Sequence, residues 1–343
     1  MRYRPVGHSG IKVSEVGFGC WTMGGPAFSP ANGAPIGWAD VDEDEVLAGI
    51  KVGLDAGVNH WDNADVYGNG RAERMLAACF RKLGVKPGSQ VVATKVGHMK
   101  GTAPHAFEPR HMRAQCEQSL RNLGVDAIDI YYCHHGSYIG LGYDGKQHDY
   151  LHEAAATMHA IKKEGKIRAI GQSAYSDDDF ARAIPVLKPD VLQSKANMRF
   201  DPFIRPGSVL QKLMAEHGCA FVAFGPLDQG ILLDKFDPEK PPKFEEGDYR
   251  ASRKDFAPTA LREVRTKLGE IKRRFGTEGL TGDGLTAALS SIASRWVLAH
   301  PNVCSAIPGF RNAKQAKSNV RAGSDTPMGD SDVAFVRDLF GSA

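Results

Sequence analysis

Residues 59–68, Asn59-His-Trp-Asp-Asn-Ala-Asp-Val-Tyr-Gly68, join a short apolar run to a polar turn. The run at 58–61 predicts a strand, and the pattern at 71–83 predicts a helix directly after the turn. Asp62 and Tyr67 lie between the two, five residues apart. The rest of the chain repeats this strand–turn–helix unit, and the carboxylate and phenol at its turn suit a proton-transfer site.

The same unit recurs along the chain. Short apolar runs without alternation, which are typical of buried parallel strands, each precede a helical pattern. Eight such strands in succession predict an α/β fold, the (β/α)8 TIM barrel. The predicted strands are 13–18, 58–61, 91–95, 128–133, 167–171, 191–193, 220–224 and 303–307. The predicted helices are 42–57, 71–83, 109–123, 150–164, one that begins at 176, 207–217 and 312–321.

Segments outside these units predict additions to the barrel. Residues 1–12 hold two glycines between β-prone pieces and predict an N-terminal β-hairpin, while 258–274, 285–299 and 332–340 predict extra helices near the C-terminus. A doubly wound sheet is also compatible with the alternation. Against it, the glycine-rich pieces at 17–22 and 68–73 lack the third glycine of the dinucleotide fingerprint.

The composition is that of an ordinary globular protein, and no break in it marks a domain boundary, so we expect a single domain over residues 1–343. The chain is 42% apolar and 24% charged, and its formal net charge of +3 is too small to favour nucleic acid. Six scattered cysteines predict reduced thiols and no metal site. Without an apolar signal segment or a membrane-length apolar run, we expect a cytoplasmic protein with no membrane partner.

Polar side chains gather at the ends of consecutive predicted strands, which share one mouth in a barrel of this kind. An ammonium at Lys95 would lower the pKa of Tyr67, and Asp62 would hold that ammonium in place. A histidine there can hydrogen-bond a substrate oxygen, so the set suits protonation of a carbonyl, with a cofactor supplying the electrons. Each residue alone has a structural reading as a packing, solvated or turn residue, but their conjunction favours function. The converging residues are Asp62, Tyr67, Lys95, His134, Ser173 and Gln193.

Five runs of the chain resemble the aldo-keto reductase family. They are Trp61-Asp-Asn-Ala-Asp-Val-Tyr-Gly68 with Glu73, Val92-Ala-Thr-Lys95, Asp129-Ile-Tyr-Tyr-Cys-His134, Gly165-Lys-Ile-Arg-Ala-Ile-Gly-Gln-Ser173 and Ile307-Pro-Gly309. The resemblance covers nearly the whole chain. It implies NAD(P)H-dependent reduction of an aldehyde or ketone to an alcohol, or the reverse oxidation, with Tyr67 protonating the carbonyl oxygen. The catalytic tetrad that it implies is Asp62, Tyr67, Lys95 and His134.

The resemblance also implies where the cofactor binds. Arg311, near a helix N-terminus, fits a 2′-phosphate, so we expect NADP(H), with NAD(H) less favoured. Ala174 and Ser318 stand where the family has asparagine and an acidic residue, and Phe224 replaces the tyrosine that stacks on the nicotinamide. The implied cofactor-binding residues are Ser173, Gln193, Phe224, Gly225, Pro226, Leu227, Gln229, Gly230, Gly309, Arg311, Gln315 and Asn319.

At the substrate end, the resemblance places Trp21 at the mouth of the site, with a core tryptophan as the competing reading, and His135 in the pocket wall or in solvent. The substrate would be a small carbonyl compound selected by loops at 24–38, 136–148 and 234–256, of which 234–250 is a lid or a surface loop. Two alternatives stay open: an NAD-linked sugar or polyol dehydrogenase of the same fold, and a regulatory subunit resembling channel β-subunits. A short-chain dehydrogenase is disfavoured because no tyrosine has a lysine four residues later.

Overall fold

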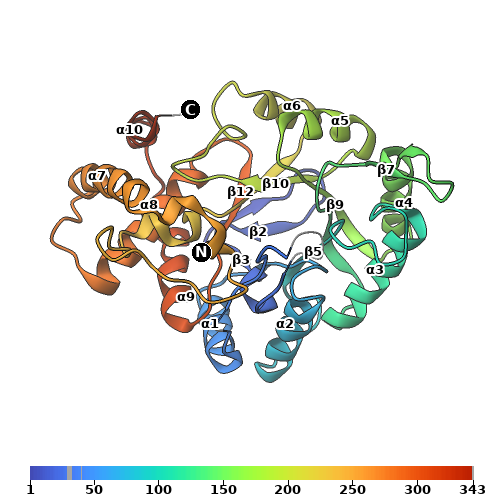
Figure 1. Ribbon diagram of the computed structural model, residues 1–343, viewed down its shortest axis with the longest axis horizontal. Coiled ribbons are helices and arrows are strands. Elements are labelled where there is room, and N and C mark those ends of the chain that lie inside the picture. The colour runs from blue at the N-terminus through green and yellow to red at the C-terminus, as the bar shows by residue number, and fades with distance from the viewer. Residues whose placement is uncertain (29–32, 40, 342–343) are drawn as a thin grey trace.

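The computed structural model describes residues 1–28, 33–39 and 41–341. Within them, eight parallel strands form one sheet in the order β12-β11-β10-β9-β6-β5-β4-β3. Bridges from Val16 to Ala306 and from Gly19 to Gly309 join its two edges and close a barrel (Figure 1). The predicted barrel is therefore confirmed. Its strands are β3 (Phe18–Gly19), β4 (His60–Asp62), β5 (Val91–Val96), β6 (Ile128–Cys133), β9 (Ile167–Ser173), β10 (Val191–Lys195), β11 (Ala220–Phe224) and β12 (Val303–Ile307).

Helices surround the barrel (Figure 1), and several of them begin at a side-chain cap. Asp42 accepts hydrogen bonds from two backbone N–H groups at the start of α1, and Ser176 caps α5. The outer helices are α1 (Glu43–Asp55), α2 (Arg71–Lys82), α3 (Pro109–Leu123), α4 (Leu151–Lys163), α5 (Asp177–Leu187), α6 (Val209–His217) and α9 (Ala313–Val320). The predicted additions near the C-terminus are present as α7 (Pro258–Arg274), α8 (Gly282–Leu298) and α10 (Asp330–Phe340).

The predicted N-terminal hairpin is present, but it takes residues that the sequence assigned to the first barrel strand. β1 (Tyr3–Pro5) pairs antiparallel with β2 (Lys12–Ser14), so the predicted strand 13–18 is wrong as a single element. The chain leaves the hairpin after Ser14 and pairs with the barrel only from Val16 onward. Apolar content marked both pieces as β-prone, whereas the change of partner depends on contacts distant in sequence.

Apolar side chains pack on both sides of the barrel strands. Inside, Val6 and Val13 from the hairpin join a buried cluster with side chains such as Ile130 and Val222. The hairpin therefore fills the end of the barrel at which the strands begin. Outside, Trp61 packs edge-on against Phe80, and a larger cluster fills the space between strands and helices. His60 and Asp62 flank Trp61 and so point inward, because successive strand residues face opposite sides.

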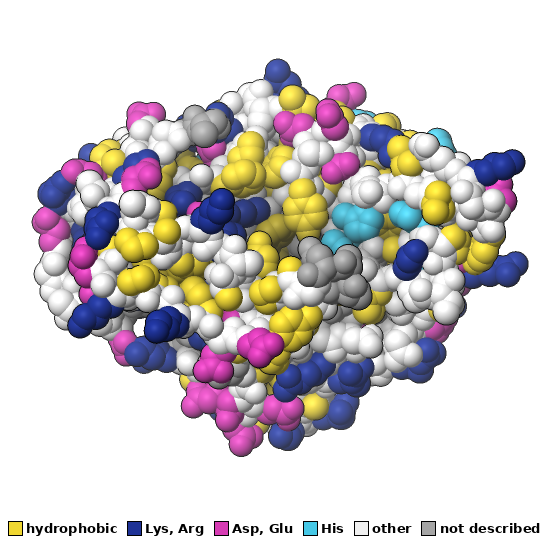
Figure 2. Space-filling model, viewed as in Figure 1, with side chains coloured by type: hydrophobic (Ala, Val, Ile, Leu, Met, Phe, Trp, Pro, Cys, Tyr) yellow, Lys and Arg dark blue, Asp and Glu magenta, His cyan; other side chains and the backbone are white. Residues whose placement is uncertain are grey.

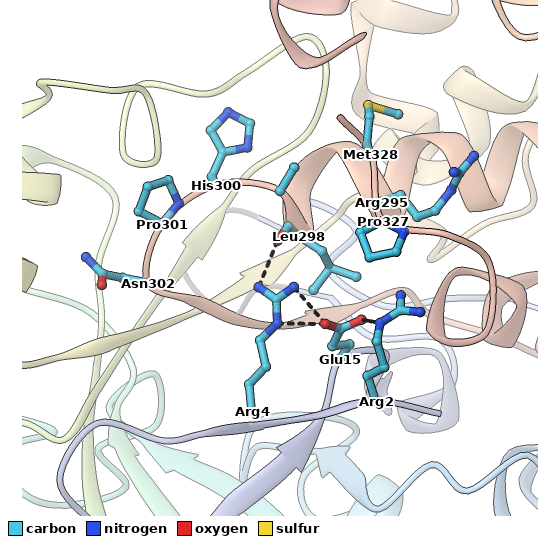
Figure 3. Close-up of a pocket in the computed structure, with 11 residues that line it drawn as sticks. Arg2, Arg4, Glu15, Arg295, Leu298, His300, Pro301, Asn302, Pro327 and Met328 are labelled. Carbon is cyan, nitrogen blue, oxygen red and sulfur yellow. Dashed lines mark hydrogen bonds and ion pairs between the residues drawn. The ribbon is translucent and has the colours of Figure 1, made fainter. Parts of the chain in front are cut away.

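Arg2 and Arg4 of the hairpin are held at this end of the barrel by ion pairs with Glu15 and by hydrogen bonds to backbone carbonyls of the C-terminal part of the chain (Figure 3). Arg4 and Arg2 each donate to the buried carboxylate of Glu15 at 2.7–2.8 Å. Arg4 also donates to the carbonyls of Leu298 and Val303, which satisfies an acceptor at the end of α8. A cavity of about 380 Å³ lies beside this cluster. The guanidinium groups of Arg2 and Arg4 therefore already have partners within the protein.

Two kinds of element lie outside the sequence-based prediction. A second hairpin, β7 (Ile139–Leu141) with β8 (Gln147–Asp149), extends the connection after β6. Short 3-10 helices follow the barrel strands at η1 (Trp21–Gly24) and η2 (Asp228–Leu233), and three more occur at η3 (Tyr249–Ser252), η4 (Lys254–Phe256) and η5 (Arg321–Gly323). In the described part of the chain, no helix has the length and apolar character needed to cross a membrane.

Candidate active site

The four residues of the predicted tetrad lie together at the C-terminal end of neighbouring barrel strands. Asp62 ends β4, Lys95 lies near the end of β5 and His134 directly follows β6. Tyr67 comes from the turn before α2, where Gly68 has a φ of 59° and a Cβ would lie 2.1 Å from the carbonyl oxygen of Gly24. Only glycine fits there, so this close approach fixes the turn that carries Tyr67.

Lys95 and Asp62 form a buried ion pair at the centre of the group. Their Nζ and Oδ2 atoms are 2.6 Å apart, and the side chains are 0% and 3% exposed. Lys95 also donates to the backbone carbonyl of Asn63 at 2.6 Å and, more weakly, to the hydroxyl of Tyr67 at 3.4 Å. The other carboxylate oxygen of Asp62 accepts from Gln193 at 2.7 Å. The pair is hydrogen-bonded on both sides, which a buried ion pair requires.

Tyr67 and His134 are held in their neutral forms. Burial, reinforced by the negative charge of Asp62, raises the pKa of Tyr67 well above its usual value. This corrects the expectation that Lys95 lowers it, because loss of hydration outweighs a hydrogen bond of 3.4 Å. Burial also lowers the pKa of His134 well below its usual value, and the neighbouring His98 and Lys95 add to this effect. The site therefore holds a protonated phenol and an uncharged imidazole.

A cavity of about 1650 Å³ opens from these residues. In Figure 2, apolar and histidine side chains gather near the centre of the face shown. Four polar atoms of residues in the cavity wall are buried and have no hydrogen-bond partner within the described residues: Trp38 Nε1, His134 Nδ1, Ser173 Oγ and Gln229 Oε1. All twelve predicted cofactor-binding residues line this cavity: Ser173, Gln193, Phe224, Gly225, Pro226, Leu227, Gln229, Gly230, Gly309, Arg311, Gln315 and Asn319.

The anion-binding segment predicted around Arg311 is internally ordered. The side-chain oxygen of Gln315 accepts from the backbone N–H of Arg311 at 2.9 Å, and Asn312 caps the N-terminus of α9. Asn319 donates to the carbonyl of Gly309 at 3.1 Å. Ser318 also lines the cavity. Ala174 is buried and offers no side-chain donor, whereas Ser173 and Gln193 both line the cavity with polar side chains.

Basic residues that the sequence did not single out surround the same cavity. Lys235 has no ion-pair or hydrogen-bond partner within the described residues. Solvent reaches it through the cavity, yet burial and the charges of Arg250 and Arg311 lower its pKa to about 8. Over the described residues, Asp62 is the one acidic side chain in the wall, against seven basic ones. Besides Arg311, which the sequence did single out, the basic residues are Arg71, Lys100, Lys195, Lys235, Arg250 and Arg253.

Trp21, which the resemblance placed at the mouth of the site, lines the cavity near Tyr67. Its ring lies 5.2 Å from that of Tyr249 and 6.2 Å from that of Tyr67, measured between centroids. His135 does not line the cavity. Both of its ring nitrogens have backbone partners: Nε2 lies 2.7 Å from the carbonyl oxygen of Gly97, and Nδ1 accepts from a backbone N–H. His98, which the sequence reasoning missed, lines the wall instead. Residues 29–32 of the loop 24–38 lie outside the described residues.

Comparison with known proteins agrees with this geometry. The model of the aldo/keto reductase family matches residues 15–339. The chain is 29% identical to an NADP(+) aldo-keto reductase, yakc, from Schizosaccharomyces pombe (96% of this chain, 89% of the relative). It is 26% identical to a probable voltage-gated potassium channel subunit beta from Arabidopsis thaliana (96% and 93%). The structure of an aldo-keto reductase from Bacillus halodurans superposes with a TM-score of 0.72 at 22% identity (100% and 97%), which supports the fold.

The chain therefore belongs to the aldo/keto reductase family. It is an NAD(P)H-dependent oxidoreductase built on the barrel that the sequence predicted.

Proposed function

We propose that the protein reduces an aldehyde or ketone to the alcohol with NADPH, in a reversible reaction, and that Tyr67 is the general acid. One observation carries the proposal. A single cavity joins a neutral phenol, which rests on a buried Lys95–Asp62 pair, to a wall rich in basic residues. The first feature suits proton delivery to an oxygen, and the second suits a phosphate-bearing cofactor.

The residues in the wall fit a nicotinamide dinucleotide. The unpartnered oxygens of Ser173 and Gln229 offer hydrogen bonds to its polar groups, and the ring of Phe224 offers a face for stacking. Lys235 and Arg311 offer positive charge to its phosphates. When bound, NADPH supplies the hydride that the side chains of the protein cannot provide.

In the proposed reaction, each of the four tetrad residues has a separate role. Tyr67 keeps its proton until a carbonyl oxygen accepts it, because its raised pKa disfavours release to solvent. Lys95 then stabilises the phenolate through the hydrogen bond that already joins the two groups. Asp62, itself held by Gln193, keeps the ammonium in position. His134 donates an N–H to the carbonyl oxygen and orients it without adding charge.

The preference for NADPH over NADH rests on Arg311 and its basic surroundings. Replacing Arg311 with Ala should weaken NADPH binding by about 10-fold or more, the loss expected for a charged hydrogen bond, and change NADH binding little. Arg321→Ala, which removes a guanidinium paired with Asp325 outside the cavity wall, is the matched control. Dissociation constants of NADPH and NADH for each variant, measured by cofactor fluorescence, test this preference. Equal loss for both cofactors would assign Arg311 a structural role instead.

The similarity to plant channel subunits supports a second candidate, a regulatory subunit that senses its bound cofactor. The two functions differ in sustained turnover. A panel of sugar aldehydes, aromatic aldehydes and 2-oxoaldehydes, with NADPH consumption and alcohol formation as readouts, separates them. Multiple turnovers support the reductase, whereas a single turnover followed by arrest supports the regulatory role.

A further inference from the structure

A second imidazole lies beside His134 at the substrate end of the cavity. His98 follows β5, three residues after Lys95, and its ring centroid is 4.3 Å from that of His134. Both rings line the cavity. Within the described residues, the ring nitrogens of His98 have no hydrogen-bond partner. Its N–H is therefore available to a ligand in the cavity.

The backbone holds His98 at this place. Gly97 has a φ of 151°, and a Cβ there would lie 3.0 Å from the ring of Phe107 and 3.2 Å from the Cβ of His134. A larger residue would push the segment away from β6. The carbonyl of Gly97 also accepts a hydrogen bond from His135, whose ring lies 5.1 Å from that of His98. The chain thus turns tightly and presents His98 next to the proposed site of the carbonyl oxygen.

Both imidazoles of the pair are uncharged near neutral pH. Burial lowers the pKa of His98 to about 4, and the neighbouring His135 and Lys95 add to this effect. His134 is shifted in the same direction. Each neutral ring carries one N–H donor and no charge. Such a pair suits two uncharged oxygens better than a carboxylate, which would favour a cationic partner.

We propose that His98 forms a second oxygen-binding subsite, and that the preferred substrates are 2-hydroxy- or 2-oxocarbonyl compounds. The inference rests on the proposed function, in which His134 binds the reacting carbonyl oxygen. Oxygens on adjacent carbons lie roughly one hydrogen-bond length apart, so two rings separated by 4.3 Å can each reach one of them. His98 is then a specificity-determining residue for the oxygen next to the reaction centre.

The test compares two aldehydes of the same shape, 2-hydroxypropanal and 2-methylpropanal, which differ by a hydroxyl in place of a methyl group. The wild type should favour the hydroxyaldehyde in kcat/KM, and His98→Leu should lower that preference by about 3- to 10-fold, as expected for one neutral hydrogen bond. His98→Asn, which keeps a donor, should restore part of the preference. His105→Leu removes a nearby imidazole outside the cavity wall and should leave the ratio unchanged. An unchanged ratio in His98→Leu would overturn the subsite.

A binding experiment separates this inference from the proposed function. The products 1,2-propanediol and 2-methyl-1-propanol are titrated into the NADP+ complex of the wild type, His98→Leu and His98→Asn, with tryptophan fluorescence as the readout. The subsite predicts tighter binding of the diol to the wild type and loss of that difference in His98→Leu. Equal affinities in the wild type would refute the subsite even if turnover is normal. Absence of turnover with a preserved diol preference would instead refute the proposed reductase function.

Discussion

Replacing Tyr67 with Phe should separate catalysis from folding and cofactor binding. The substitution removes one oxygen atom, whose hydrogen bond from Lys95 is long at 3.4 Å. Lys95 keeps its two shorter bonds, each of 2.6 Å, to Asp62 and to the carbonyl of Asn63. We therefore expect the free energy of unfolding to fall by about 1 kcal/mol or less. Loss of a general acid should lower kcat by roughly 10²–10⁴-fold.

The assay measures NADPH oxidation with an aldehyde, the NADPH dissociation constant and urea unfolding on the same variant. Tyr131→Phe is the matched control, because it also removes a buried tyrosine hydroxyl. The hydroxyl of Tyr131 has no hydrogen-bond partner in the described chain, and Tyr131 does not line the cavity. The Tyr131→Phe variant should retain wild-type kcat. Since the pKa of Tyr67 is raised, deprotonation of this group should not slow reduction below about pH 10. A Tyr67→Phe variant with kcat within about tenfold of the wild type would show that the acid lies elsewhere.

Two further predictions concern the charged groups. Lys95→Met should lower the free energy of unfolding in urea by about 3–5 kcal/mol, because the carboxylate of Asp62 would stay buried without its cation. Adding Asp62→Leu should recover part of that loss. No recovery would argue against the ion pair as the cause. The affinity for NADPH should fall as the pH rises through about 8, where Lys235 of the free protein loses its proton. In Lys235→Gln, the NADPH dissociation constant should depend less on pH. The same pH profile of that constant in both proteins would contradict a phosphate role for Lys235.

The sequence could predict the barrel because each strand and helix carries a local signal. The apolar run 128–133 and the helix 109–123, for instance, match β6 and α3 residue for residue. Contacts between distant segments carry no such signal. Ser14 pairs with Tyr3 in the hairpin instead of extending the first barrel strand, and Lys235, in the connection after β11, lines the cavity. A lone histidine such as His98 is equally ambiguous until its neighbours are known.

The direction of the Tyr67 pKa shows why the chemistry of the site needed the structure. The predicted position of Lys95 at the same mouth of the barrel suggested that it would lower the pKa of the Tyr67 phenol, whereas burial raises that pKa. Lowered pKa values also leave His98 and His134 uncharged, so these two rings offer neutral hydrogen-bond donors to the cavity. The positive charge of the cavity wall lies on its lysine and arginine side chains. This separation suits the proposed reduction. The basic side chains can attract an anionic cofactor, while the proton of Tyr67 stays in place until negative charge develops on the carbonyl oxygen.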